Sequence, residues 1–198
     1  MRKVVLVTLM SLDGSVDHPA QSMSPSHEPG QPPEFDAVMD ANEEEIIGTQ
    51  DAVLLGRGMY DEWSQFWPTV EDQPFADFIN GVKKYVVTST PLPDDTRWHN
   101  SEAVHGPVED VVRDLKSRPG GDIGVHGSIE LAQSLIGLGL VDELRLVVGP
   151  AFGFTGRRLF TGADEVHRLE LLDATATPTG SVLLAYRVLP GGGVPAVR

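Results

Sequence analysis

The feature that most constrains the fold of this chain is a regular alternation of short apolar runs with stretches of helical periodicity. Residues 3–9 (KVVLVTL) and 51–55 (DAVLL) are runs rich in β-branched or aliphatic residues, which are typical of strands buried on both faces of a sheet. Between residues 35 and 46, apolar residues return at helical spacing while acidic residues mostly take the other positions. This alternation predicts an α/β fold with a mostly parallel central sheet that is covered by helices on both faces.

The rest of the chain continues the pattern and closes with a hairpin. We predict further strands at residues 84–89, 122–126, 143–148, 166–175 and 181–189, and helices at residues 74–82, 107–118 and 128–138. The turn at residues 177–180 joins the last two strands, so they form an antiparallel hairpin at the C-terminal end. The length of 198 residues fits a single domain over residues 1–198.

Two segments are predicted to lack regular secondary structure. Residues 17–34 are rich in Pro, Ser, His and Gln, and we predict a loop insertion there, acting as a lid or simply disordered. Residues 190–198 (PGGGVPAVR) are predicted to be a flexible tail.

The charge balance limits the partners of the chain. It carries 15 Lys and Arg against 29 Asp and Glu, a formal charge of −14. Such a chain lacks the basic field that attracts polyanions, so we expect neither nucleic acid nor a membrane surface as partner. It has no cysteine and its histidines show no metal-ligand spacing, so we expect no metal. With no span-length apolar run and no signal-peptide pattern, we expect a cytoplasmic protein that acts on a small molecule.

Three strand–helix junctions carry the residues best suited to hold a ligand. They are residues 55–60 (LGRGMY), 87–91 (VTSTP) and 125–129 (VHGSI). The carboxyl ends of parallel strands meet at one sheet edge, and the N-termini of the helices that follow favour anions. Three junctions at one edge predict an extended ligand with several phosphates.

These junctions, together with residues 11–14 (SLDG), the run 139–144 (GLVDEL), Pro150 and residues 158–160 (RLF), resemble motifs of a known superfamily. It comprises dihydrofolate reductase and the reductase domain of the riboflavin-biosynthesis protein RibD, and the resemblance extends over residues 3–188. It implies a dihydrofolate-reductase-like three-layer α/β/α sandwich. It also implies an NADPH-dependent reductase that transfers hydride to a pterin-like or pyrimidine-like ring, or to a carbonyl substrate, often as a homodimer.

The resemblance also assigns cofactor-binding positions. The adenine-side phosphate turn corresponds to Gly56, Arg57, Gly58 and Met59, with Ser89 and Thr90 near the ribose 2′-phosphate. The pyrophosphate turn corresponds to Val125, His126, Gly127, Ser128 and Ile129, with Ser128 also placed to cap the following helix; Leu12 and Gly14 border the nicotinamide.

Some residues depart from the family pattern or leave two readings open. Met59 stands where a threonine is common, and His126 stands where a glycine is common; His126 either reaches the cofactor or is a hydrogen-bonded packing residue. Dihydrofolate reductases use a buried acid on the first helix. Asp40 is the nearest candidate for this catalytic acid, with Asp36 one turn earlier, unless both belong to a solvated face.

Asp13, Trp63 and Trp67 are candidate substrate contacts. The tryptophans form either an aromatic wall for a planar ring or ordinary core anchors, and Asp13 could instead serve its own turn. The C-terminal strands and Phe152, Phe154 and Phe160 offer an apolar surface that a homodimer would bury.

Three functions remain open from the sequence. The first is reduction of an unidentified heteroaromatic or carbonyl compound. The second is the 5-amino-6-(5-phosphoribosylamino)uracil reductase reaction of riboflavin biosynthesis, which is disfavoured because residues 40–45 (DANEEE) would repel a sugar phosphate where RibD reductases carry a basic helix. The third is a non-catalytic nucleotide-binding module.

Overall fold

The computed structural model describes residues 1–17, 19–23, 35–93, 98–161, 165–190 and 194–195. Over this part of the chain, an eight-stranded sheet has the order β4-β3-β2-β5-β1-β6-β9-β8. Its strands are β1 (Val4–Ser11), β2 (Gln50–Gly56), β3 (Lys83–Val87), β4 (Ser101–Val104), β5 (Asp122–His126), β6 (Glu143–Gly149), β8 (Leu169–Ala176) and β9 (Val182–Val188). The strands from β4 to β6 are parallel, and β9 and β8 add an antiparallel hairpin. The predicted mostly parallel sheet with a C-terminal hairpin is confirmed.

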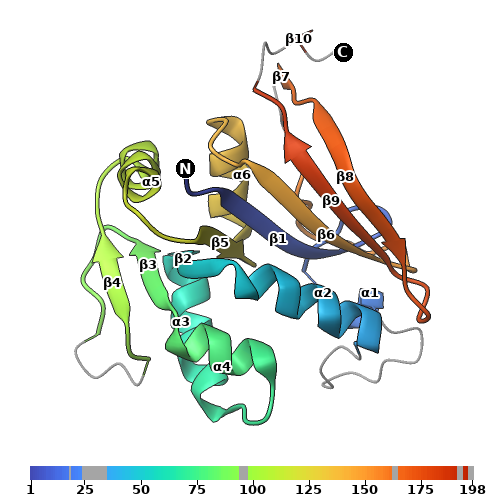
Figure 1. Cartoon of the computed structure of the whole chain (residues 1–198), viewed down its shortest axis with the longest axis horizontal. Coiled ribbons are helices and arrows are strands. Elements are labelled where there is room, and N and C mark those ends of the chain that lie inside the picture. The colour runs from blue at the N-terminus through green and yellow to red at the C-terminus, as the bar shows by residue number, and fades with distance from the viewer. Residues whose placement is uncertain (18, 24–34, 94–97, 162–164, 191–193, 196–198) are drawn as a thin grey trace.

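Helices cover both faces of this sheet (Figure 1). The helices are α1 (Pro19–Met23), α2 (Ala37–Gly48), α3 (Arg57–Phe66), α4 (Pro74–Gly81), α5 (Val108–Ser117) and α6 (Ile129–Gly137), with a 3-10 turn η1 (Trp67–Thr69) after α3. In Figure 1, α2, α3 and α4 lie below the strands and α5 and α6 lie above them. The chain therefore has the expected three layers.

Central strands send alternate side chains into two separate cores. In β2, Ala52 and Leu54 join the cluster beneath α5 and α6, whereas Val53 and Leu55 join the cluster beneath α3 and α4. All four are at most 2% exposed, which explains why this strand has no polar face in its sequence. A third, smaller cluster includes Met39 from α2 and packs beside β6 and β9.

The structure differs from the sequence prediction in four segments. The junction at residues 87–91 was expected to lead from a strand into a helix, but no helix follows β3 among the described residues before β4. The short strand β4 was not predicted, because SEAV is neither long nor apolar. Helix α1 lies inside the segment expected to be a loop, and its fully buried Met23 anchors it in the third cluster; residues 24–34 lie outside the described residues. Within the expected tail, β10 (Val194–Pro195) pairs with β7 (Glu165–Val166), outside the main sheet.

Among the described residues, no helix is long and apolar enough to cross a membrane.

Candidate functional site

The candidate site lies at the carboxyl edge of the parallel strands, where β5 is inserted between β2 and β1. From the end of β2 the chain crosses to β3 on one side, and from the end of β5 it crosses to β6 on the other side. The two connections that leave this point therefore run in opposite directions. Open α/β sheets bind ligands at such switch points, because the connections there diverge and leave a crevice. The first and third junctions lead from β2 into α3 and from β5 into α6 at this edge, whereas the second follows β3 and continues as a loop in the described residues before β4, so it is not the strand–helix junction that was predicted.

A hydrogen bond joins the first and third junctions. The backbone N–H of Gly56, at the end of β2, donates to Oγ of Ser128 over 3.0 Å. Ser128 was expected to cap α6, but its side chain makes no cap hydrogen bond because the hydroxyl is turned toward Gly56. Helix α3 also begins without a side-chain cap. Two neighbouring helices thus start with N–H groups that no side chain satisfies, which is an arrangement suited to anions.

Arg57 joins the first and second junctions. Its Nη1 donates to Oγ1 of Thr90 over 2.7 Å and to the carbonyl of Pro91 over 3.1 Å. Thr88 lies within the same group, since its hydroxyl contacts that of Thr90 at 3.3 Å. Ser89 and Thr90 are both exposed, so their hydroxyls are open to a ligand.

Gly127 is held in a left-handed conformation under two side chains of α3. Its φ is +70°, and a Cβ built there would lie 2.9 Å from Cε of Met59 and 3.2 Å from Cζ2 of Trp63. Only glycine tolerates both the backbone angle and this close approach. Met59 therefore packs α3 onto the third junction, in place of the hydroxyl contact a threonine would make, while Gly58 is exposed in the first turn of that helix.

His126 is a packing residue and not a group that faces the ligand edge. It is 5% exposed, and its Nε2 lies 2.8 Å from Oε1 of Gln50. Its ring packs against those of Phe75 and Phe78 at centroid distances of 5.3 and 6.1 Å. Burial lowers the pKa of His126 to about 4, so the imidazole is neutral at physiological pH. Its neighbours Val125 and Ile129 are also buried core residues.

Of the two acids Asp40 and Glu43 on α2, Glu43 is the one that is partly buried. Asp40 is exposed, and Asp36 caps the helix by accepting from the backbone N–H groups of Val38 and Met39. Glu43 lies one turn after buried Met39 and one turn before buried Ile47, on the same stripe. Burial, together with the charges of Asp40 and Glu44, raises the pKa of Glu43 to about 7. The helical spacing from Met39 is the sequence signal that identifies it.

The turn after β1 is tied to the loop after β6. Asp13 accepts from Oγ of Ser11 over 2.5 Å, from the backbone N–H of Gly153 over 3.1 Å and from Arg158 over 3.3 Å. The hydrogen bond from Ser11 is the main reason why the pKa of Asp13 lies below its usual value. Asp13 thus secures the turn, which is the second of the two roles that its position in the sequence allowed. Gly14 has a φ of +81°, and Leu12 is 68% exposed at the rim of the site.

Trp63 and Trp67 belong to an aromatic cluster around Phe75. The centroids lie 5.9 Å apart for Trp63 and Phe75 and 4.9 Å apart for Trp67 and Phe75. Both tryptophans are partly buried and pack on the core beneath α3 and α4. The core-anchor reading of these residues therefore describes their contacts better than an open aromatic wall.

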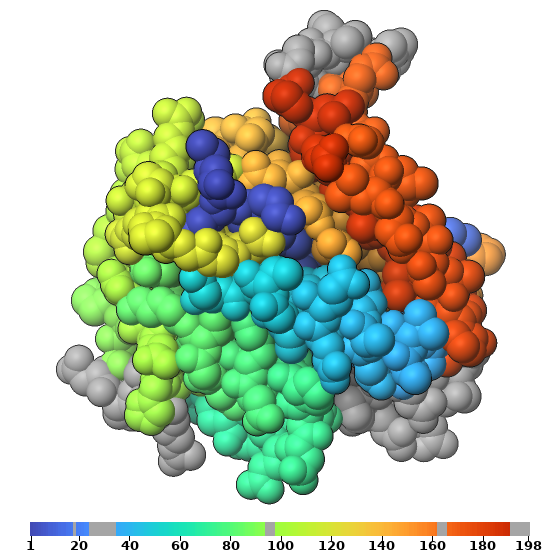
Figure 2. All heavy atoms as spheres, in the orientation of Figure 1, coloured from blue at the N-terminus to red at the C-terminus, as the bar shows by residue number. Residues whose placement is uncertain are grey.

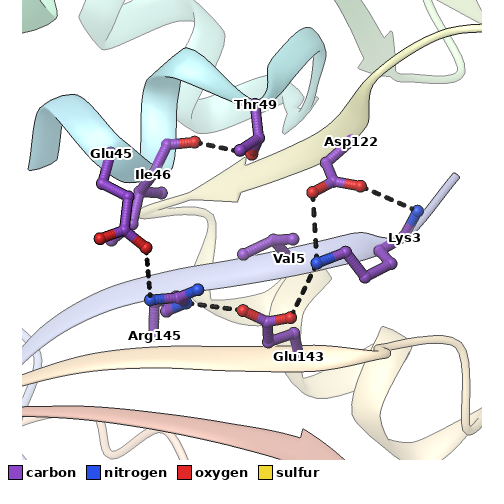
Figure 3. Close-up of a pocket in the computed structure, with 8 residues that line it drawn as sticks. All are labelled: Lys3, Val5, Glu45, Ile46, Thr49, Asp122, Glu143 and Arg145. Atoms are coloured by element: carbon purple, nitrogen blue, oxygen red, sulfur yellow. Dashed lines mark hydrogen bonds and ion pairs between the residues drawn. The ribbon is translucent and has the colours of Figure 1, made fainter. Parts of the chain in front are cut away.

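A hollow opens at the opposite, amino edge of the sheet (Figure 3). Its cations are engaged: Nζ of Lys3 lies 3.0 Å from Glu143, and Nε of Arg145 lies 2.6 Å from the other oxygen of the same carboxylate. Glu45 of α2 approaches Arg145 at 3.6 Å. These ion pairs connect α2 to the N-terminal ends of β1 and β6. Because the cations are already paired with carboxylates, this hollow is poorly suited to an anion.

Comparison with known proteins finds several that resemble this chain over nearly all of its length. The uncharacterized protein YyaP of Bacillus subtilis (strain 168) is 27% identical over 192 residues, covering 93% of this chain and 94% of its own. A pyrimidine reductase-like protein from Corynebacterium diphtheriae has a TM-score of 0.68 at 16% identity, covering 96% of this chain and 93% of its own. Acinetobacter baumannii RibD has a TM-score of 0.65 at 16% identity, and this chain covers 59% of it.

At 16% identity, the two solved structures show a shared fold alone. The family model described as the RibD C-terminal domain matches residues 2–183. Because this match extends over nearly the whole chain, the chain belongs to the RibD C-terminal domain family.

Proposed function

We propose that the chain is an NADPH-dependent reductase that delivers hydride to a small heteroaromatic or carbonyl substrate. The observation that carries this proposal is that hydrogen bonds from Gly56 to Ser128 and from Arg57 to Thr90 join the segments that follow β2, β3 and β5 into one wall. A dinucleotide phosphate carries anionic groups at two separate positions, and a joined wall offers donors to both. Membership of the RibD C-terminal domain family supports a reductase role.

The donors at this edge fit such a cofactor. The open N-termini of α3 and α6 suit the pyrophosphate, while Arg57, Ser89 and Thr90 suit a ribose phosphate. The missing side chain of Gly127 lets Met59 and Trp63 of α3 pack closely on the third junction, which holds the first and third junctions together. When bound, the nicotinamide supplies the hydride. The protein has to align the two rings and exclude water, and Leu12 and Gly14 lie at the end of β1 for that purpose.

Glu43 supplies a group that holds a proton near neutral pH. With a pKa of about 7, its carboxyl is protonated in a large share of molecules and can donate a hydrogen bond to a ring nitrogen or carbonyl oxygen. Among the described residues, no hydrogen bond or ion pair engages this carboxyl. We therefore propose Glu43, in place of Asp40, as the acid of the site.

The charge of α2 bears on the substrate. Asp40, Glu43, Glu44 and Glu45 follow within six residues, and these carboxylates would repel a doubly negative sugar phosphate. We therefore favour a substrate ring without a phosphate. The family match favours 5-amino-6-(5-phosphoribosylamino)uracil as the second candidate.

We further propose that the chain works as a cytoplasmic homodimer with no nucleic-acid or membrane partner. Strands β8 and β9 form one flank of the molecule, shown in orange to red in Figure 2. Leu169 and Leu171 of β8 lie opposite Val188 and Tyr186, which pack on the core beneath α5 and α6. The apolar face of the sheet thus continues uncovered over β8, where Leu171 is 55% exposed.

The proposal is tested by titrating the purified protein with NADPH and with NADH, followed by nicotinamide fluorescence. NADPH oxidation is then measured with dihydrofolate, with 5-amino-6-(5-phosphoribosylamino)uracil and with unphosphorylated pyrimidine and carbonyl compounds. We expect NADPH to bind and an unphosphorylated compound to be reduced. Reduction of the sugar phosphate alone would establish the second candidate. Binding without any oxidation would indicate a nucleotide-binding module, and absence of binding would contradict the proposal.

A further inference from the structure

The guanidinium of Arg57 is already engaged by a carboxylate of its own helix. Nε of Arg57 donates to both oxygens of Asp61, over 2.8 and 2.9 Å, one turn further along α3. Nη1 points the other way, to Thr90 and Pro91. Among the described residues, Nη2 has no partner, so part of the fork stays open to an anion.

The ion pair between Arg57 and Asp61 changes the electrostatic potential that a ligand meets at the second junction. Arg57 is the cation that joins the exposed hydroxyls at this junction, and Asp61 places a full negative charge against it. The side chains of Arg57 and Asp61 are 32% and 50% exposed, so both charges lie where a ligand would approach. A phosphate that binds Nη2 and Thr90 gains the attraction of Arg57 but is repelled by Asp61.

We infer that Asp61 is a specificity-determining residue that reduces the preference of this site for a 2′-phosphorylated nicotinamide cofactor over its unphosphorylated form. The inference rests on the proposed function and concerns the same edge of the sheet. The hydroxyls of Ser89 and Thr90 accept and donate equally well to a plain ribose, whereas only the phosphate experiences the carboxylate of Asp61. Wild-type protein accordingly binds both cofactors, with a modest preference for NADPH.

The test separates the charge of Asp61 from its hold on Arg57. Asp61→Asn keeps an acceptor oxygen for Nε but removes the negative charge. We expect the dissociation constant for NADPH to fall about two- to fivefold, the range of an exposed ion pair, while that for NADH stays unchanged. Asp61→Ser removes the same charge with a shorter side chain and is expected to shift the ratio in the same direction.

Glu62→Gln is the matched control, because it removes the same charge from the next position of α3, where the exposed side chain has no ion pair with Arg57. Binding is measured by calorimetry or nicotinamide fluorescence at low and high salt, and the gain in Asp61→Asn is expected to shrink as salt screens the charge. An unchanged NADPH-to-NADH ratio in both Asp61 variants, or an equal shift in Glu62→Gln, would overturn the inference alone. Failure of the wild type to bind either cofactor would overturn the proposed function together with it.

Discussion

At the scale of single residues, two side chains take roles that their positions in the sequence did not reveal. Ser128 stands at a helix start, yet its hydroxyl serves the neighbouring junction. His126 follows a strand at the ligand edge, yet its ring turns into the core, where Gln50 receives its hydrogen bond. Each choice depends on a partner more than 70 residues away, so local sequence cannot decide between them.

Glu43 shows the opposite case, because the sequence contained the signal. Counting upstream from Gly56 selects Asp40, but the helical period of Met39 and Ile46 selects Glu43. A count of residues along the chain does not identify the partly buried acid, because the position of each residue around the helix decides which side chain is buried.

The raised pKa of Glu43 makes the stability of the protein depend on pH. The folded state holds this proton up to about pH 7, whereas the unfolded chain releases it near the usual value of 4.5. Folding is therefore favoured below that window, and the free energy of unfolding falls as pH rises from about 4.5 to 7. We expect Glu43→Gln to be more stable than wild type by roughly 1–2 kcal/mol at pH 8 and to lose this advantage at pH 4, in urea unfolding experiments.

The same variant tests the role of the acid. We expect Glu43→Gln to lower the turnover of a responsive substrate roughly a hundredfold while NADPH binding is retained. Glu44→Gln, an exposed neighbour on α2, serves as control. Its charge is the smallest of the three causes that raise the pKa of Glu43, so we expect stability and turnover to change much less than in Glu43→Gln. Equal behaviour of the two variants would contradict the assignment of Glu43.

At the scale of elements, the strands that are buried on both faces were predictable, because burial forces an apolar run whatever its partners. The sequence did not predict β4 or α1. Strand β4 exists because its backbone pairs with β3 at the sheet edge, and α1 exists because Met23 reaches a core built by distant strands. Neither the pairing of β4 with β3 nor the burial of Met23 produces a recognisable pattern in the nearby sequence.

Lys84 of β3 satisfies backbone carbonyl groups at the end of helix α4. It is fully buried in β3, and its Nζ donates to the carbonyls of Ile79 and Val82, each over 2.9 Å, at the end of α4. Lys84→Met would leave these carbonyls without a donor, and we expect it to lower the free energy of unfolding by about 2–3 kcal/mol. Lys83→Met removes an exposed ion pair with Glu102 and a cation–π contact with the ring of Tyr85, but no buried hydrogen bond, and should cost below about 1 kcal/mol. A similar urea midpoint for both variants would show that Lys84 does not stabilise the helix end.

At the scale of the whole molecule, the sheet is closed on one flank by β4 and left apolar on the other. The parallel part of the sheet and an apolar surface on the C-terminal strands were predictable from the sequence, but the residues of β8 that form this surface were not, because strand pairing decides which side chains share a face. The register places Leu169 and Leu171 on one face beside the covered side chains of β9.

This face leads to a prediction about assembly. We expect the wild-type protein to be a dimer by light scattering and Leu171→Glu to be a monomer, because a charge at a buried interface is costly. Leu138→Glu changes an apolar side chain that is 46% exposed at the end of α6 and should leave the dimer intact. A monomeric wild type, or a dimeric Leu171→Glu, would rule out β8 as the interface.

The central claim is that the junctions after β2, β3 and β5 act as one binding wall. The most direct measurement is an NMR titration of the isotope-labelled protein with NADPH, following the backbone amides of Gly56, Thr90 and Gly127. The joined junctions predict that all three amides shift together with a single dissociation constant. Shifts confined to one junction, or three amides that do not respond, would contradict it.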